Sequence, residues 1–266
     1  MTNPVANSAT HFSHAVARRP GASATRGLRA ADRGAPDLAR MRAAHDAYIA
    51  VLRSTGAEVV VLDAEEAYPD ALFVEDTALC VPGGAIMMRL GAASRMGEVA
   101  QMRPTLAALF GDLRDITGLG HIEGGDILFT GREVLVGRSA RTDAAGVAEL
   151  RVILDEWGHS LRELQTPEGV LHFKTDCSLL DPETILSTRL LDAEGCFEGY
   201  RVLHLPEGEE AAANAIRFND VVLLPDGFPK TAEMLTREGY DIRHIDNTDC
   251  ALLDGGMSCL SLRFNV

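Results

Sequence analysis

Apolar residues recur with helical spacing in four segments of the chain, and a short strand-like run follows each segment. The helical spacing covers residues 37–56, 97–110, 143–157 and 229–238. The strand-like runs that follow cover residues 58–63, 113–116, 161–164 and 241–246. Between them lie pairs of further runs, at 73–81 with 85–89, 125–129 with 134–137, 177–180 with 184–187, and 216–218 with 221–224. The pattern predicts a repeated strand–strand–helix–strand unit.

An acidic residue heads three of the strand pairs at a regular interval, at Asp76, Asp126 and Asp176. Weaker echoes follow at Asp220 and at residues 256–259, which we expect to be a strand. One unit is abbreviated, because the helix before residues 201–205 is reduced to 192–199. A period near fifty is typical of circular repeat proteins, and the helices favour an α/β propeller over an all-β one. Evenly spaced aspartates can also arise by chance, but the helix and strand patterns recur with them.

The chain shows no linker or low-complexity stretch, so we expect residues 1–266 to form a single catalytic domain. A first strand is expected at residues 12–18, and about residues 1–10 are expected to be a flexible N-terminal extension. Of the 266 residues, 46% are hydrophobic and 24% are charged, which is typical of a globular protein with a large core.

The charge pattern narrows the classes of partner. The net charge is −14 and no run is rich in lysine or arginine, so binding to nucleic acid is disfavoured and small cations are favoured. No stretch approaches the ~18 apolar residues of a membrane span. The five cysteines lack paired spacing, which predicts no disulfide framework, no zinc site and a reducing, cytoplasmic compartment. Nucleotide-binding motifs are absent, so we expect no cofactor and no metal.

Cys259 has a different context from the other cysteines, because Gly255, Gly256 and Ser258 flank it. A substrate can approach a thiol at a glycine turn, whereas Cys80 lies in an apolar run and is expected in the core. A catalytic thiol needs a general acid or base. Among the eight histidines, His172 follows an apolar run that leads into a polar turn, although a lone strand histidine is more often structural.

Carboxylates cluster at the ends of two strand-like runs. Glu75 and Asp76 follow the apolar residues 72–74, and Glu123 precedes a pair of glycines and the run at 127–129. Carboxylates so placed suit a guanidinium, which takes charge-assisted hydrogen bonds in a plane. The alternative is that they cap turns or pair with arginines.

Taken in chain order, these segments resemble the dimethylarginine dimethylaminohydrolases of the guanidine-modifying (pentein) superfamily. The matching motifs are PDALFVED (69–76), GAASR (91–95), EGGD (123–126), GRSART (137–142), VLHFK (170–174) and GGMSCLSLR (255–263). The resemblance spans nearly the whole chain. It implies a five-bladed α/β propeller, in agreement with the repeat.

The resemblance also implies a reaction, the hydrolysis of Nω-methylated arginines to citrulline and a methylamine. Cys259 would attack the guanidinium carbon and form a covalent thiouronium. His172 would protonate the departing amine and then activate water, while Glu123 would hold the guanidinium. A bound guanidinium or a protonated His172 would favour the thiolate, since a free thiol has a pKa near ~8.5.

The remaining residues that the resemblance implies would bind the substrate. They are Leu28, Asp70, Glu75, Asp76, Arg95 and Arg141. Asp76 would share the guanidinium with Glu123, and the two arginines would meet the α-carboxylate. Leu28 would lie in an N-terminal loop that acts as a lid and contacts the substrate through its backbone.

The sequence leaves three other functions open. An arginine deiminase or amidinotransferase could use the same residues, although deiminases typically carry a helical insertion. Non-catalytic penteins bind ribosomal partners, but they need no ordered Cys259, His172 and Glu123. A redox-sensing Cys259 would oxidise reversibly without turnover. The preferred methylation state, the oligomeric state (a homodimer is one alternative) and inhibition by zinc at Cys259 are not given by the sequence.

Overall fold

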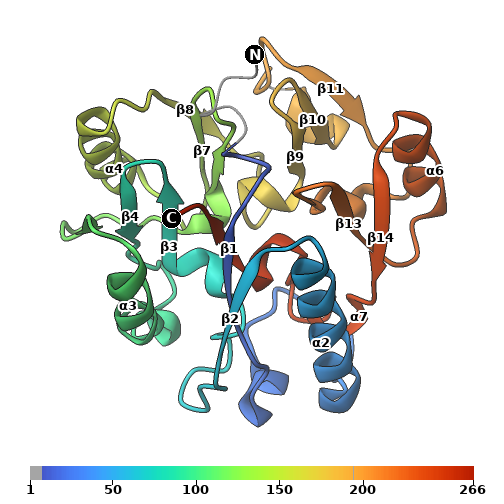
Figure 1. The fold of residues 1–266 in the computed structure, drawn as a ribbon, viewed down its shortest axis with the longest axis horizontal. Helices are drawn as coiled ribbons and strands as arrows, with labels where there is room; N and C mark the ends of the chain where they lie inside the picture. The colour runs from blue at the N-terminus through green and yellow to red at the C-terminus, as the bar shows by residue number, and fades with distance from the viewer. Residues whose placement is uncertain (1–7, 194) are drawn as a thin grey trace.

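The computed structural model describes residues 8–193 and 195–266, which form five three-stranded sheets around a common centre (Figure 1). This architecture confirms the predicted five-bladed α/β propeller. Most of the expected N-terminal extension lies outside the described residues. Within its described part, Thr10 is buried and its carbonyl accepts a hydrogen bond from the backbone N–H of Asn219. None of the helices among the described residues is both long enough and apolar enough to cross a membrane.

In each sheet the middle strand pairs antiparallel with one neighbour and parallel with the other. The sheets are β15 (Leu262–Phe264), β1 (His14–Arg18) and β2 (Glu58–Leu62); β3 (Ala78–Val81), β4 (Gly84–Met87) and β5 (Leu113–Asp115); β6 (Ile127–Phe129), β7 (Val134–Arg138) and β8 (Leu161–Gln165); β9 (Cys177–Asp181), β10 (Thr184–Ser187) and β11 (Arg201–His204); and β12 (Ile216–Phe218), β13 (Val221–Pro225) and β14 (Asp241–Ile245). The first sheet joins both ends of the chain and closes the ring.

A helix connects each pair of parallel strands. These helices are α2 (Leu38–Ser54), α3 (Glu98–Leu109), α4 (Ala144–Glu156), α5 (Arg189–Asp192) and α6 (Pro229–Arg237), and a short α7 (Thr248–Ala251) follows β14. The carboxylates of Asp37 and Asp143 accept backbone N–H groups at the starts of α2 and α4, which fixes where these helices begin. The short α5 confirms an abbreviated unit, but it ends at Asp192, where the predicted helix was to begin.

Hydrophobic side chains fill the seams between neighbouring sheets. On β13, Val221 and Leu223 pack toward β1 and α2, whereas Val222 and Leu224 pack toward β9 and β10. Because both faces of the strand are buried, its sequence is continuously apolar rather than alternating. Hydrophobic side chains likewise fill the other three seams, so each sheet packs against two neighbours.

Short 3₁₀ turns precede the antiparallel edge strand of each sheet, and at three of these places the sequence analysis expected a strand instead. They are η2 (Val74–Thr77), η4 (Gly124–Asp126), η5 (Phe173–Thr175), η6 (Glu210–Ala213) and η7 (Ser258–Leu260); η1 (Ala22–Arg26) and η3 (Ala93–Arg95) lie elsewhere. The predicted strands at 73–81, 125–129 and 256–259 are corrected accordingly. In these segments polar side chains form hydrogen bonds with nearby backbone groups, which favours turns over strand pairing. Successive turns η7, η2, η4, η5 and η6 contact one another near the centre.

Candidate active site

Side chains from turns near the centre of the ring and from nearby loops line a pocket. Seven residues expected at the site line it, namely Leu28, Asp70, Asp76, Arg95, Arg141, His172 and Cys259. The expected residues come from four of the five sheet units and from the N-terminal loop, so only the closed ring brings them together.

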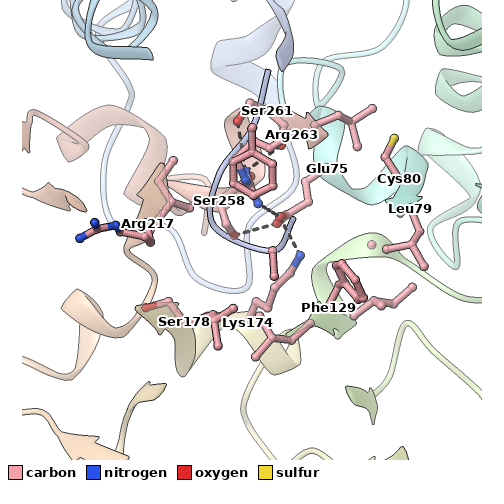
Figure 2. A pocket seen from close by; sticks show the side chains of 18 of the residues that line it. Glu75, Leu79, Cys80, Phe129, Lys174, Ser178, Arg217, Ser258, Ser261 and Arg263 are labelled. Carbon is pink, nitrogen blue, oxygen red and sulfur yellow. Dashed lines mark hydrogen bonds and ion pairs between the residues drawn. The ribbon is translucent and has the colours of Figure 1, made fainter. Parts of the chain in front are cut away.

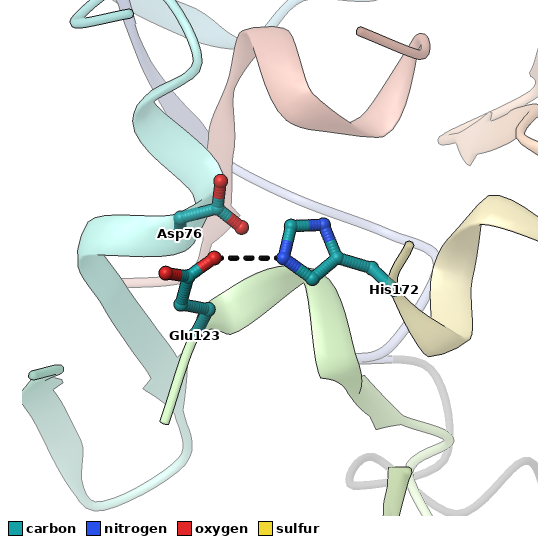
Figure 3. A group of neighbouring side chains, drawn as sticks. All are labelled: Asp76, Glu123 and His172. Atoms are coloured by element: carbon teal, nitrogen blue, oxygen red, sulfur yellow. Dashed lines mark hydrogen bonds and ion pairs between the residues drawn. The ribbon is translucent and has the colours of Figure 1, made fainter. Parts of the chain in front are cut away.

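His172 and Glu123 form a direct side-chain pair at this pocket. The Nε2 atom of His172 lies 2.7 Å from Oε2 of Glu123, as Figure 3 shows. Each residue precedes a 3₁₀ turn: His172 the turn η5 and Glu123 the turn η4. The strand position expected for His172 is therefore corrected. Glu123 is fully buried, and its Oε1 atom accepts the backbone N–H of Gly91 at 2.8 Å.

The charges around His172 keep its ring protonated. Burial by itself lowers the pKa of His172, but the nearby carboxylate of Asp76 and the hydrogen bond to Glu123 raise it to about 9. Burial acts in the opposite direction on Asp76, yet His172 and Arg95 hold the pKa of that carboxyl down at about 2. At neutral pH the imidazolium and the carboxylate therefore coexist, and His172 is charged to act as an acid.

Cys259 lies in η7 and is only partly exposed. The backbone N–H of Gly256 points at its Sγ atom over 3.4 Å. Burial, followed by the carboxylates of Glu75 and Asp76, raises the pKa of the Cys259 thiol to about 12. The resting thiol is therefore neutral, and a cation bound between the sulfur and the carboxylates would favour the thiolate.

The acids and arginines that were expected to bind the substrate have partners within the protein. Nη1 of Arg95 donates to Oδ2 of Asp76 at 2.6 Å. Asp70 is buried, and its Oδ1 atom accepts the backbone N–H of Leu28 at 2.8 Å, which ties the N-terminal loop to the pocket. Arg141 is less constrained, with its Nη1 atom 3.6 Å from Oε1 of Glu123.

Glu75 takes a different position from the one expected. Its carboxylate does not line the pocket of Cys259 but a second cavity of about 760 Å³ on the other side of the central turns. There Oε1 accepts from Nζ of Lys174 at 2.7 Å and from Nη2 of Arg263 at 2.6 Å, and Oε2 accepts from Ser258 at 2.7 Å (Figure 2). Adjacent residues of a tight turn point in different directions, so Asp76 reaches the pocket and the Glu75 side chain does not.

Asn214 is a site residue that the sequence analysis missed. Its Oδ1 atom accepts the backbone N–H of Ser258 at 2.8 Å, and its Nδ2 atom donates to the carbonyl of Lys174 at 2.8 Å. Asn214 thereby ties η7, which carries Cys259, to η5, which follows His172. Nothing in the local sequence marks Asn214, because its partners lie 40 and 44 residues away.

Asp76, Glu123 and His172 also form a group whose ligand atoms all lie within 4.8 Å of one another. Such a group could hold a divalent cation. Metal binding requires a deprotonated histidine, and His172 is protonated and bonded to Glu123 here. A cation would therefore compete with the His172–Glu123 pair.

Comparisons with known proteins agree with this geometry. A family model described as "N,N dimethylarginine dimethylhydrolase, eukaryotic" matches residues 34–161. The N(G),N(G)-dimethylarginine dimethylaminohydrolase of Pseudomonas aeruginosa is 36% identical over 254 residues, which are 95% of this chain and 100% of that protein.

Two crystal structures of this enzyme type are also similar. A cysteine-to-serine mutant of the P. aeruginosa protein complexed with citrulline matches with a TM-score of 0.93 at 35% identity, covering 96% of this chain and 100% of that one. A histidine-to-glycine dimethylarginine dimethylaminohydrolase adduct with S-methyl-L-thiocitrulline matches with a TM-score of 0.92 at 35% identity, covering 95% and 100%.

Proposed function

Because this chain belongs to the dimethylarginine dimethylaminohydrolase family, we propose that it hydrolyses Nω-methylated L-arginines to L-citrulline and a methylamine. One observation carries the proposal: a histidine held protonated by a buried glutamate lines the same pocket as a partly exposed cysteine. The citrulline and thiocitrulline complexes of the similar enzymes support the same product class.

Substrate binding begins with the guanidinium cation. Asp76 lines the same pocket as Cys259, Glu123 lies beside Asp76, and both acids are buried, so they would attract a bound cation strongly. Once the cation replaces water beside the sulfur, the pKa of the Cys259 thiol falls and the thiolate forms on the bound substrate. The thiol proton passes to solvent at this stage.

The first chemical step forms the Cys259 Sγ–carbon bond and gives a tetrahedral intermediate. When the carbon–nitrogen bond to the methylated nitrogen breaks, His172 transfers its proton to that nitrogen. The methylamine then leaves as a neutral molecule rather than as an anion. A general acid placed in this way typically contributes ~10²–10⁴ in rate. The product of the step is a cationic thiouronium on Cys259.

The second step is hydrolysis. The neutral His172 now accepts a proton from water, whose oxygen attacks the thiouronium carbon. In the collapse of this second intermediate the carbon–sulfur bond breaks, the hydroxyl proton passes to Sγ, and citrulline leaves with Cys259 regenerated as the thiol. Glu123 stabilises the protonated form of His172. His172 can therefore act first as an acid and then, once neutral, as a base.

The amino-acid end of the substrate would lie at the rim of the pocket. Arg141 has only a long ion pair to Glu123 and is free to bind the α-carboxylate. Asp70 suits the α-ammonium group, and the Leu28 loop covers the entrance through its bond to Asp70. With a cationic side chain for the α-carboxylate and an anionic one for the α-ammonium group, the pocket would favour a free amino acid over an amine without a carboxylate.

Turnover measurements test the proposal. Purified protein should release citrulline from dimethyl- or monomethylarginine, and Cys259→Ser should be inactive while Cys80→Ser, which alters another partly exposed thiol, retains activity. Parallel assays with arginine, and with arginine plus an amine acceptor, separate this reaction from a deiminase or an amidinotransferase. The proposal is contradicted if the wild-type protein forms no citrulline from methylarginines, or if Cys259→Ser keeps full activity.

The proposal includes a cytoplasmic location and a single catalytic domain. All five cysteines lie among the described residues and none of them forms a disulfide, which supports a reducing compartment. A homodimer is the assembly to test, by light scattering of the purified protein.

A further inference from the structure

Arg95 has little freedom to bind a substrate, because most of its donors are occupied. A guanidinium carries five N–H groups in a planar fork. Nε donates to both Glu98 oxygens at 3.1 and 3.2 Å, and Nη2 donates to Glu98 at 2.9 Å and to the carbonyl of Phe73 at 3.0 Å. Nη1 donates to Asp76. Among the described residues, one N–H on Nη1 is left without an acceptor.

Glu98 fixes the direction of that remaining N–H. It is the first residue of α3, it is 3% exposed, and it lies outside the set of residues that line the pocket. A bidentate carboxylate sets both the position and the rotation of a guanidinium. Without Glu98, two buried donors of Arg95 would lack an acceptor, and the fork would turn toward Asp70 or Asp76.

We propose that Glu98 is a positioning residue, which holds Arg95 so that its one available Nη1 N–H meets the α-carboxylate of the substrate. The inference rests on the proposed function. The inference gives the two arginines different roles at the α-carboxylate. Arg141 approaches the carboxylate freely, whereas Arg95 contributes a single directed hydrogen bond. Asp76 keeps its place in either case, because Gly125 donates to its other oxygen at 2.9 Å.

The charge of Glu98 is sensitive to its surroundings. Burial, with smaller contributions from Asp70 and Asp76, raises the pKa of Glu98 to about 7 against the lowering effect of Arg95. Arg18 also faces Glu98. When Glu98 is protonated, it no longer forms a charged bidentate pair with Arg95. The affinity for the substrate should therefore weaken below neutral pH.

The test compares Glu98→Gln with Gln101→Ala, a matched change at an exposed position of the same helix. We expect the KM for the methylarginine to rise ~10–100-fold in Glu98→Gln, as for the loss of a charge-assisted hydrogen bond, with kcat within about threefold of wild type. Gln101→Ala should change neither constant. An unchanged KM in folded Glu98→Gln overturns the inference.

Two further measurements separate positioning from a structural effect. In an Arg95→Ala background, Glu98→Gln should add no further rise in KM, because the effect of Glu98 passes through Arg95; additive losses would contradict the inference. The decarboxylated substrate, which lacks the carboxylate, should show the same KM with and without Glu98→Gln, and a rise there would also contradict it.

If Glu98→Gln does not fold, Glu98→Asp replaces it. Aspartate keeps the charge but has a shorter reach, so the KM should still rise, and an unchanged KM would be evidence against the inference. Failure of the proposed function is distinct, since the wild-type protein itself would then form no citrulline. If wild type is active and the Glu98 variants match it, only the present inference fails.

Discussion

The imidazole of His172 lies 2.7 Å from the carboxylate of Glu123, although 49 residues separate them along the chain. Each residue stands immediately before a 3₁₀ turn of its own sheet unit, and these two turns contact one another near the centre of the ring. The pair thus depends on the repeat itself, because equivalent positions in neighbouring units meet at the axis.

Glu123→Gln should lower the pKa of His172. The carboxylates raise that pKa to about 9, so His172 stays protonated below about pH 9 and loses its proton above it. Loss of the Glu123 charge removes part of this stabilisation, and the alkaline limb of the rate profile should move to lower pH by about one unit or more. The pH dependence of kcat measures the shift.

Glu168→Gln is the control for this change, since Glu168 is an exposed acid close to His172 in sequence. Its profile should match that of wild type. An unchanged alkaline limb in Glu123→Gln would show that Glu123 does not govern the ionisation of His172.

Gly125→Ala should reduce turnover strongly. A Cβ atom at Gly125 would lie 2.7 Å from Oδ1 of Asp76 and 2.8 Å from Nδ1 of His172, so both side chains would have to move. A displacement near 1 Å can cost ~10²-fold in rate. Gly111→Ala is the matched control, because nothing lies within 4 Å of a Cβ at Gly111. Steady-state kinetics of the two variants tests this, and equal activities would contradict it.

Glu75→Gln should destabilise the protein rather than only weaken substrate binding. Glu75 is 3% exposed and balances the buried charges of Lys174 and Arg263. Removing one partner of a buried ion pair costs about 3–5 kcal/mol. Urea unfolding of Glu75→Gln should show a loss of this size in the free energy of unfolding.

The control for Glu75 is Glu233→Gln, which breaks an exposed pair with Arg237 on α6. Exposed pairs contribute about 0–1 kcal/mol, so its loss should be small. A similar, small loss in both variants would mean that the Glu75 cluster contributes little to stability.

His45 should make stability depend on pH. The side chain is 3% exposed, its Nε2 atom has no hydrogen-bond partner among the described residues, and burial lowers its pKa to about 4. The unfolded chain binds a proton near ~pH 6.5 and the folded chain does not. The free energy of unfolding should therefore fall by up to about 3 kcal/mol as the pH drops from 6.5 to 4, and stay constant above 7 with respect to this group.

His45→Leu tests this account, because an apolar side chain of similar size takes up no proton. The variant should lose most of the slope between pH 6.5 and 4 in urea titrations, whereas His11→Gln, at an exposed position, should keep it. Identical slopes in wild type and His45→Leu would rule out His45 as the source.

The amino-acid sequence by itself determined the repeat and, through the family resemblance, the chemistry and half of the residues that line the pocket. Continuous apolar runs such as Val221–Pro225 appear as strands, and Asp37 and Asp143 mark the starts of helices. These signals are local, since they depend on side-chain periodicity and on hydrogen bonds within a few residues. Cys259 was recognised for a similar reason, from the small residues beside it.

Only the tertiary structure decided which way neighbouring side chains point and what lies behind them. Asp76 enters the pocket while Glu75 faces Lys174 and Arg263, because a 3₁₀ turn directs consecutive residues to different sides. The partners of Asn214, in the turns of two other units, follow from contacts between separate units of the ring. Such contacts leave no periodic trace in the chain, since each depends on how the closed ring brings its distant segments together.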